Sequence, residues 1–229
     1  MPVFLMSHEL IFPAVELSEK NGLLAVGGDL SPERLKIAYE KGIFPWFGKD
    51  DPILWWSPDP RLVLLPDKLH VSRSMRQTLK QGVFQVTFDR CFREVIMACR
   101  ETRGEEGGEG TWITEAMVEG YCRLHEQGIA HSVAAWRNGE LAGGLYGVSL
   151  GACFFGESMF IKVSNASKAA LITLIRALQA RAFMLVDCQV DSSHLKRMGA
   201  ELIPRKIFLR TIEAALKQAT LQGKWTDWT

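Results

Sequence analysis

Two apolar segments that each contain one carboxylate place the strongest restriction on how this chain can fold. They are residues 153–160 (CFFGESMF) and residues 183–190 (FMLVDCQV). The segment between them has apolar residues at the helical spacing i, i+3, i+4 and i+7, namely Leu171, Leu174, Ile175 and Leu178. Asn165 or Ser167 is a suitable cap for that helix. A strand, a helix and a second strand predict a right-handed crossover that joins two parallel neighbours in one sheet.

Glu157 and Asp187, the carboxylates in these segments, are the first candidates for a functional site. Burying a carboxylate is costly unless it is paired or hydrogen-bonded. We expect both side chains near the carboxyl ends of the two parallel strands, and therefore close together. Strand alternation puts Gln189 on the same face as Asp187 and turns Cys188 to the opposite face. The simpler interpretation is that each carboxylate only caps or bridges a neighbour, but two in adjacent apolar strands favour a site.

The order of the other elements predicts an α+β fold with a mixed sheet and flanking helices. A strand at 83–88 and two helices precede a three-strand meander at 131–136, 140–148 and 152–160. This is the order of the acyl-CoA N-acyltransferase (GNAT) fold. Those enzymes hold the CoA pyrophosphate in a Gly-containing turn before the crossover helix, whereas the turn at 162–168 (KVSNASK) has no Gly. The sequence therefore predicts this fold with an acyl donor other than CoA.

A segment rich in Trp and Pro precedes the predicted sheet. Residues 43–60 (IFPWFGKDDPILWWSPDP) contain three of the seven Trp and four of the nine Pro. A small aromatic core explains this composition, and so does an aromatic platform on a loop, where binding residues gather. We place a domain boundary at its end, which predicts a small N-terminal domain at 1–60 and a catalytic domain at 61–229.

A short basic helix is the only local positive feature that we single out, because a net charge of +1 gives no global attraction to nucleic acid or membrane. Ser72 caps this helix, which ends at Gln81, and three cations share one face of it, namely Arg73, Arg76 and Lys80. We call these three residues the basic row. A solvated helix face is the usual explanation, and a phosphate-binding strip is the more specific one.

Several classes of protein are disfavoured by composition. The five His show no metal-ligand spacing, so we expect no metal. Five Cys without CxxC spacing favour a reducing cytosol over a disulfide framework. The longest apolar segment, residues 141–160, contains five Gly and Glu157, so two buried strands are expected there and not a membrane span. The N-terminus also lacks the pattern of a signal peptide. We expect a cytoplasmic protein.

Ten segments of the chain resemble one family, the bacterial leucyl/phenylalanyl-tRNA–protein transferases. They are NGLLAVGGDLSPERL (21–35), KGIFPWF (41–47), DPILWWSPDPR (51–61), HVSRSM (70–75), EGTWIT (109–114), GGLYGV (143–148), GESMF (156–160), NASKAAL (165–171), DCQV (187–190) and MGAELIPR (198–205). They occur in order over nearly the whole chain, and several are long and unusual in composition. The visible departures are an acidic Gly-rich insertion around 103–109 and the C-terminal tail.

The resemblance implies transfer of Leu or Phe from aminoacyl-tRNA to the N-terminal Arg or Lys of acceptor proteins, which marks them for N-end-rule degradation. It implies that Asp187 and Gln189 form the catalytic pair and that Glu157 helps to position the amine. Trp46 and Trp112 would hold the terminal adenosine of the tRNA, and the basic row would contact its backbone. The implied amino-acid pocket is lined by Leu145, Phe154, Met159 and Leu171. No cofactor is implied.

The chemistry of the residues is compatible with those roles. The donor is already an activated ester, so holding an amine against it supplies much of the rate. The amine must be neutral when it attacks, and Asp187 could accept its proton directly or through Gln189. Phe154 and Met159 lie five positions apart, so a regular strand points them to opposite faces. If both line the pocket, we expect a bulge at Gly156.

Two other functions compete with this interpretation. One is a CoA-dependent N-acetyltransferase on the same scaffold, which the Gly-free turn disfavours. The other is a non-catalytic RNA-binding module built on the Trp-rich segment and the basic row. Such a module has no need of Glu157 and Asp187 inside apolar strands.

Overall fold

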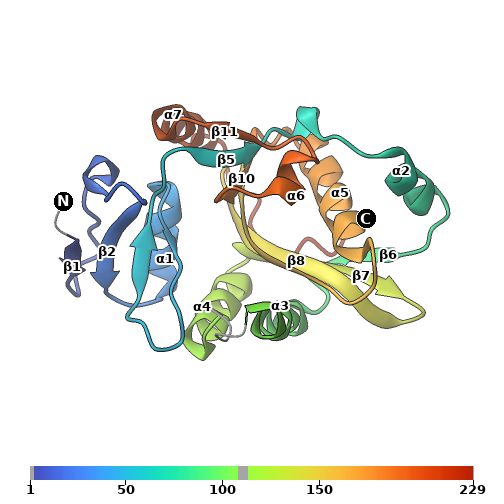
Figure 1. The fold of residues 1–229 in the computed structure, drawn as a ribbon, viewed down its shortest axis with the longest axis horizontal. Helices are drawn as coiled ribbons and strands as arrows, with labels where there is room; N and C mark the ends of the chain where they lie inside the picture. Colours follow the sequence, from blue (N-terminus) through green and yellow to red (C-terminus); the bar gives the residue numbers. More distant parts are fainter. Residues whose placement is uncertain (1–2, 108–112, 229) are drawn as a thin grey trace.

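The computed structural model describes residues 3–107 and 113–228, whose strands form two sheets (Figure 1). The small sheet has the order β1-β2-β4-β3, with bounds Phe4–Met6, Leu23–Gly27, Leu54–Trp56 and Phe44–Pro45. The large sheet has the order β11-β5-β10-β9-β8-β7-β6. Its strands are, in that order, Glu201–Ile203, Arg61–Leu64, Leu185–Gln189, Cys153–Ile161, Glu140–Leu150, Ala130–Arg137 and Gln85–Phe88.

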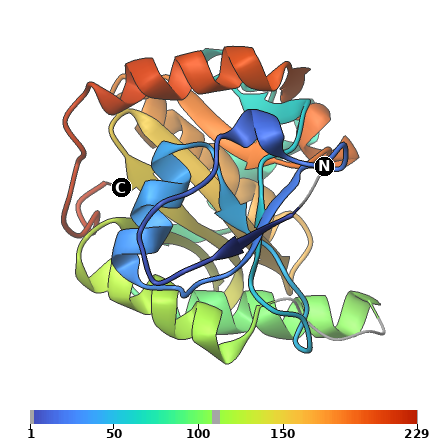
Figure 2. The same ribbon diagram turned by 90° about the vertical axis from the view of Figure 1, so that its left-hand side faces the viewer.

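Helices cover both faces of the large sheet. They are α1 Pro32–Glu40, α2 Arg73–Lys80, α3 Phe92–Gly107, α4 Glu115–Glu126, α5 Ala166–Gln179, α6 Ser193–Lys196 and α7 Arg205–Leu216, with short 3-10 helices at Val15–Leu17 and Pro66–Lys68. α5 packs on β7, β8 and β9 from one side, and α3 packs on the same strands from the other. Figure 2 shows α7 along the top of the molecule and α3 and α4 along the bottom. The predicted α+β fold with a mixed sheet and flanking helices, in the GNAT order of meander, helix and parallel strand, is confirmed.

The predicted crossover joins β9 to β10 through α5, and the two strands pair in parallel. β9 carries a bulge where it pairs with β8. Tyr146 faces Ser158 and Gly147 faces Gly156, so Glu157 is the extra residue between two registered pairs. The bulge expected at Gly156 is therefore present, and it falls on the candidate carboxylate. A bulge re-aims the side chains on either side of it.

Helix ends agree with the sequence at some positions and differ at others. Ser31 caps α1 and Ser72 caps α2, each by accepting a main-chain N–H. Asn165 is the N-cap residue of α5, one of the two expected positions, but its backbone lies in the left-handed region (φ 70°) and its side chain makes no capping bond. α3 runs to Gly107 and so includes the first part of the acidic Gly-rich insertion around 103–109.

The small sheet and the large sheet share one core. Leu24 and Trp55 of the small sheet belong to the same buried cluster as Val63 and Phe155 of the large sheet. A second core lies between α5 and the opposite face of the large sheet. Among the described helices, none combines the length and the apolar character needed to cross a membrane.

Candidate active site

One pocket gathers most of the side chains that the sequence singled out. It encloses about 190 Å³ between β8, β9, β10 and α5. All four predicted amino-acid-pocket residues line it, namely Leu145, Phe154, Met159 and Leu171, so the bulge lets Phe154 and Met159 serve one cavity. Glu157, Asp187 and Gln189 line the same pocket. Pockets for drug-sized ligands measure roughly 300–1,000 Å³, so this one suits a single amino-acid side chain.

Asp187 is completely buried and is held by Arg61. Nε and Nη2 of Arg61 donate to the two carboxylate oxygens of Asp187 at 2.8 and 2.7 Å. The main-chain N–H of Gln189 donates to Oδ1 of Asp187 at 2.9 Å. The guanidinium of Arg61 lies 4.7 Å from the ring centre of Phe44 and 4.6 Å from that of Phe208. Both oxygens of Asp187 are thus occupied by fixed donors.

Gln189 connects Asp187 to Glu157. Its backbone has φ 63°, in the left-handed region that non-glycine residues rarely adopt, and the pairing of β10 with β5 shifts register between Asp187 and Gln189. The amide Nε2 of Gln189 donates to Oε1 of Glu157 at 2.6 Å. Backbone strain of this kind persists only where the surroundings fix it, and it gathers at functional sites. The paired Asp187 supplies that fixation through the main-chain N–H of Gln189.

A tyrosine pair completes the contacts of Glu157. The hydroxyl of Tyr121 donates to Oε2 of Glu157 at 2.7 Å, and the hydroxyls of Tyr121 and Tyr39 are hydrogen-bonded to each other. Burial raises the pKa of Glu157 to about 7, the hydrogen bonds from Tyr121, Tyr39 and Gln189 offset part of that shift, and the charge of Asp187 adds to it. A carboxyl group with a pKa near 7 can take up and release a proton at neutral pH.

The sequence interpretation missed Arg61 and the tyrosines. All three tyrosines of the chain surround Glu157: Tyr39 and Tyr121 through hydrogen bonds, and Tyr146 as a neighbour in the pocket wall. The hydroxyl of Tyr146 is buried and has no hydrogen-bond partner among the described residues, and its ring packs edge-on against Phe92 and Tyr121. Two sequence features could have indicated these residues. The tyrosines place single hydroxyl groups in apolar segments, and Arg61 places a cation at the start of an apolar strand.

The other predicted residues lie outside this pocket. Trp46 follows β3 of the small sheet and is 43% exposed, and its ring packs 5.7 Å from that of Trp56. Trp112 lies outside the described residues. The basic row is exposed on α2, at the opposite end of the long axis from the small sheet (Figure 1). The structure therefore brings the catalytic candidates and the pocket lining together, and keeps Trp46 and the basic row apart from them.

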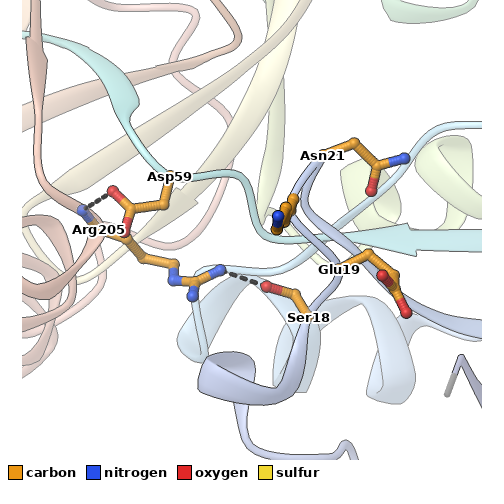
Figure 3. Close-up of a pocket in the computed structure, with 6 residues that line it drawn as sticks. Ser18, Glu19, Asn21, Asp59 and Arg205 are labelled. Carbon is orange, nitrogen blue, oxygen red and sulfur yellow. Dashed lines mark hydrogen bonds between the residues drawn. The ribbon is translucent and has the colours of Figure 1, made fainter. Parts of the chain in front are cut away.

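A larger hollow of about 600 Å³ lies where the loop before β2 approaches the start of α7 (Figure 3). It is lined by Ser18, Glu19, Lys20, Asn21, Asp59 and Arg205. Arg205 connects the start of α7 to the other side of this hollow: its main-chain N–H donates to Asp59, and its guanidinium donates to Ser18. None of the predicted site residues lines it, and all six residues that line it are polar or charged. We place the chemistry in the smaller pocket for that reason. Within the described residues, no group of three or more His, Cys, Asp or Glu is arranged to hold a metal ion.

A mixed sheet of this order, with Glu157 and Gln189 beside an apolar pocket at its crossover strands, is the arrangement expected of an acyltransferase. The chain belongs to the leucyl/phenylalanyl-tRNA protein transferase family, whose model matches residues 63–213, while the model of that family's N-terminal domain matches residues 28–59. The resemblance found in the sequence is thereby confirmed.

Relatives match over nearly their whole length. The leucyl/phenylalanyl-tRNA–protein transferase of Myxococcus xanthus is 55% identical, over 99% of this chain and 97% of its own. The protein of the same name from Syntrophus aciditrophicus is 57% identical, over 99% of this chain and 94% of its own. Among solved structures, that of L-PGS from Bacillus licheniformis is 10% identical with a TM-score of 0.42, and the match covers 74% of this chain and 53% of that chain.

Proposed function

We propose that this enzyme transfers Leu or Phe from aminoacyl-tRNA to the α-amine of proteins that begin with Arg or Lys, in the cytoplasm, and so marks them for N-end-rule degradation. The observation that carries the proposal is the single 190 Å³ pocket lined both by apolar side chains and by Glu157 and Gln189. Family membership supports the reaction type, and the pocket supports the kind of acyl group.

The donor's amino-acid side chain occupies the apolar pocket between Leu145, Phe154, Met159 and Leu171. Such a pocket accepts Leu and Phe but discriminates only modestly between side chains of similar size. Trp46, together with Trp112, holds the terminal adenosine by stacking, which needs little reading of sequence. The basic row contacts the tRNA backbone. In this arrangement residues 1–60 form a donor-binding domain and residues 61–229 form the catalytic domain.

Glu157 takes the proton in the reaction. The neutral α-amine of the acceptor attacks the ester carbonyl, a C–N bond forms, and the bond between the carbonyl carbon and the terminal ribose oxygen breaks. The proton that leaves the amine passes to Glu157, and Glu157 returns one proton to the departing ribose oxygen, so that the carboxylate is regenerated. Glu157 is suited to this because it borders the pocket and has a pKa of about 7.

Asp187 has a positioning role in this scheme. Its two oxygens already accept hydrogen bonds from Arg61 and from the main chain of Gln189, and Asp187 is completely buried, so the amine has no open approach to it. Asp187 fixes the strained backbone of Gln189, and Gln189 then orients Glu157 through its amide. Because Arg61 neutralises Asp187, Glu157 is the carboxylate that attracts the cationic acceptor.

Transfer of labelled Leu from charged tRNA to a peptide is the direct test. We expect label in peptides that begin with Lys or Arg and none in a matched peptide that begins with Ala, with no use of acetyl-CoA as donor. Binding of charged tRNA without any transfer to these peptides would reject the proposed function and favour an RNA-binding role.

A further inference from the structure

A second hollow adjoins the amino-acid pocket and is lined only by basic, neutral polar and apolar residues. It encloses about 320 Å³ and is lined by His70, Val71, Ser72, Met75, Lys168, Ile172, His194, Arg197 and Met198. His194 lines the amino-acid pocket as well, so the two cavities share a wall. We call this second cavity the basic hollow.

The cations of the basic hollow are not neutralised by the protein. Lys168 is half-buried on α5 and Arg197 is exposed just after α6, and neither forms an ion pair with a carboxylate in the described part of the chain. Nearby Lys68 and Lys196, which do not line the hollow, are paired with Glu201 and Asp191. Burial lowers the pKa of His194, and the charges of Lys168 and Arg197 lower it further. The hollow therefore has an uncompensated positive potential.

The basic hollow also lies between two parts of the proposed donor site. Ser72 in its lining caps α2, so the basic row begins at its rim. The small sheet, which carries Trp46, and α2 lie at opposite ends of the long axis (Figure 1). The basic hollow shares His194 with the amino-acid pocket and is lined by Ser72 at the start of the basic helix, so a strand that runs from the pocket to the basic row passes it.

We infer that the basic hollow binds phosphates of the single-stranded 3′ end of the donor tRNA, with Lys168 and Arg197 as the phosphate-binding residues. The inference rests on the proposed function and adds a site to it. Single-stranded nucleic acid is held by cations along its backbone and by stacking of its bases. Trp46 would supply the stacking, the basic hollow would supply the nearest backbone contact, and the basic row would supply contacts farther along the tRNA.

Three donors of increasing length separate these contacts. Phenylalanyl-adenosine has no phosphate, a phenylalanylated 3′-terminal oligonucleotide has a few, and Phe-tRNA has all of them. For Lys168→Gln with Arg197→Gln, we expect KM to rise about tenfold for the oligonucleotide and for Phe-tRNA at low salt, and to stay unchanged for phenylalanyl-adenosine. The slope of log affinity against log salt should become shallower by about 1.4, because each contact with a single-strand phosphate contributes about 0.7 and the variant loses two such contacts.

Two further variants make the comparison specific. Lys217→Gln removes one exposed charge at the end of α7 and should change none of the three KM values. Arg76→Gln with Lys80→Gln should raise KM for Phe-tRNA only, because these two residues of the basic row lie farther along α2 from the basic hollow than Arg73, beyond the reach of the oligonucleotide. Thermal melting of each variant checks that the fold is retained.

The outcomes distinguish this inference from the proposed function. If the Lys168 and Arg197 double variant melts like the wild type and keeps its KM and salt slope for the oligonucleotide, the basic hollow is not a phosphate site. If its KM for phenylalanyl-adenosine rises as much as the others, these residues shape the amino-acid pocket, which also overturns the inference. If wild-type enzyme transfers nothing from Phe-tRNA, the proposed function itself fails.

Discussion

Two buried carboxylate clusters on the large sheet have similar chemistry and different surroundings. In the first, Glu157 is bound by Gln189 and Tyr121 at the wall of the amino-acid pocket. In the second, Oδ2 of Asp89 lies 2.8 Å from Nδ1 of His131, and the main-chain N–H groups of Ser132 and Trp225 also donate to Asp89. Asp89 is 5% exposed and His131 is completely buried. A carboxylate–imidazole pair is a familiar catalytic arrangement, so the second cluster looks at first like the stronger candidate.

The second cluster is closed by the C-terminal tail. The ring of Trp225 stacks on His131 at 3.5 Å, Trp228 stacks on Trp225 at 3.7 Å, and the guanidinium of Arg181 lies 4.0 Å from the ring centre of Trp228. Asp89 therefore anchors the tail. Two hollows border Asp89, but His131 lines neither of them. The comparison teaches that a buried acid–base pair is a candidate reaction site only where a cavity reaches the group that would exchange the proton.

The two clusters also have opposite effects on stability as the pH changes. Burial lowers the pKa of His131, so below about 6.5 the unfolded chain takes up a proton that the folded chain refuses, and stability falls with falling pH. The pKa of Glu157 is raised from its ordinary 4.5 to about 7, so between these values the folded chain keeps a proton that the unfolded chain releases. Glu157 therefore makes stability fall as pH rises from 4.5 to about 7.

The largest expected effect is a loss of transfer activity that occurs when the Glu157 cluster is changed and not when the Asp89 cluster is changed. Glu157→Gln should lower transfer by about 10²–10⁴-fold, the usual contribution of a positioned proton acceptor, because the amide cannot take the proton. Asp89→Asn should keep the transfer rate per folded molecule while lowering the melting temperature. Single-turnover transfer and thermal melting of both variants check this. An equal loss of transfer in Asp89→Asn would remove the distinction between the clusters.

The second-largest expected effect is a loss of stability when the buried ion pair between Arg61 and Asp187 is broken. Arg61→Met leaves Asp187 charged and unpaired, and we expect a loss of about 3–5 kcal/mol in the free energy of unfolding. Arg61→Met combined with Asp187→Leu removes both charges and should recover most of that loss, while transfer stays low because Gln189 has lost its anchor. Urea unfolding measures the first effect. If the double variant is as unstable as Arg61→Met alone, the loss of stability does not come from leaving Asp187 charged and unpaired.

The cavity itself is tested by filling it. Leu145→Trp leaves less volume in the amino-acid pocket and should reduce transfer of Phe about tenfold more than transfer of Leu, within the range for discrimination by an apolar pocket. The ratio of kcat/KM for the two charged tRNAs is the measurement. Equal losses for both donors in a folded variant would show that Leu145 does not set the size of the pocket.

The smallest expected effect concerns pH and stability. In Glu157→Gln the group that releases its proton on unfolding is gone. The unfolding free energy of the variant, relative to wild type, should therefore rise between pH 4.5 and about 7 and level off above. Urea unfolding across that range gives the difference. If the difference in unfolding free energy between variant and wild type stays constant with pH, Glu157 has the same pKa in the folded and unfolded chain. The opposite pH effects of Glu157 and His131 on stability would then not hold.

The sequence predicted the parts of this site that depend on local pattern. Alternation and helical spacing were enough for the crossover of β9, α5 and β10, and the odd spacing of Phe154 and Met159 was enough for the bulge at Gly156. The partners of the carboxylates were not predicted. Arg61 contacts Asp187 across 126 positions of sequence, and Tyr39 contacts Tyr121 across 82. No local pattern encodes such contacts.

Backbone conformation was also beyond the sequence pattern. The left-handed φ of Gln189 follows from a register shift and from the hydrogen bond to Asp187, both of which exist only in the folded sheet. Strand alternation placed Gln189 and Asp187 on one face and did not distinguish their roles. In the structure the amide of Gln189 hydrogen-bonds Glu157, whereas the carboxylate of Asp187 is buried and paired with Arg61.

The pH dependence of single-turnover transfer tests the central claim, that Glu157 and not Asp187 accepts the proton. Wild type and Glu157→Gln would be compared from about pH 5.5 to about pH 9 at saturating donor and peptide. The wild-type rate should rise through a pKa near 7 from Glu157 and through a second near 8 from the acceptor's α-amine. Glu157→Gln should be slower throughout and keep only the second rise. A Glu157→Gln enzyme that reaches the wild-type rate, or that keeps the rise near 7, would contradict the account.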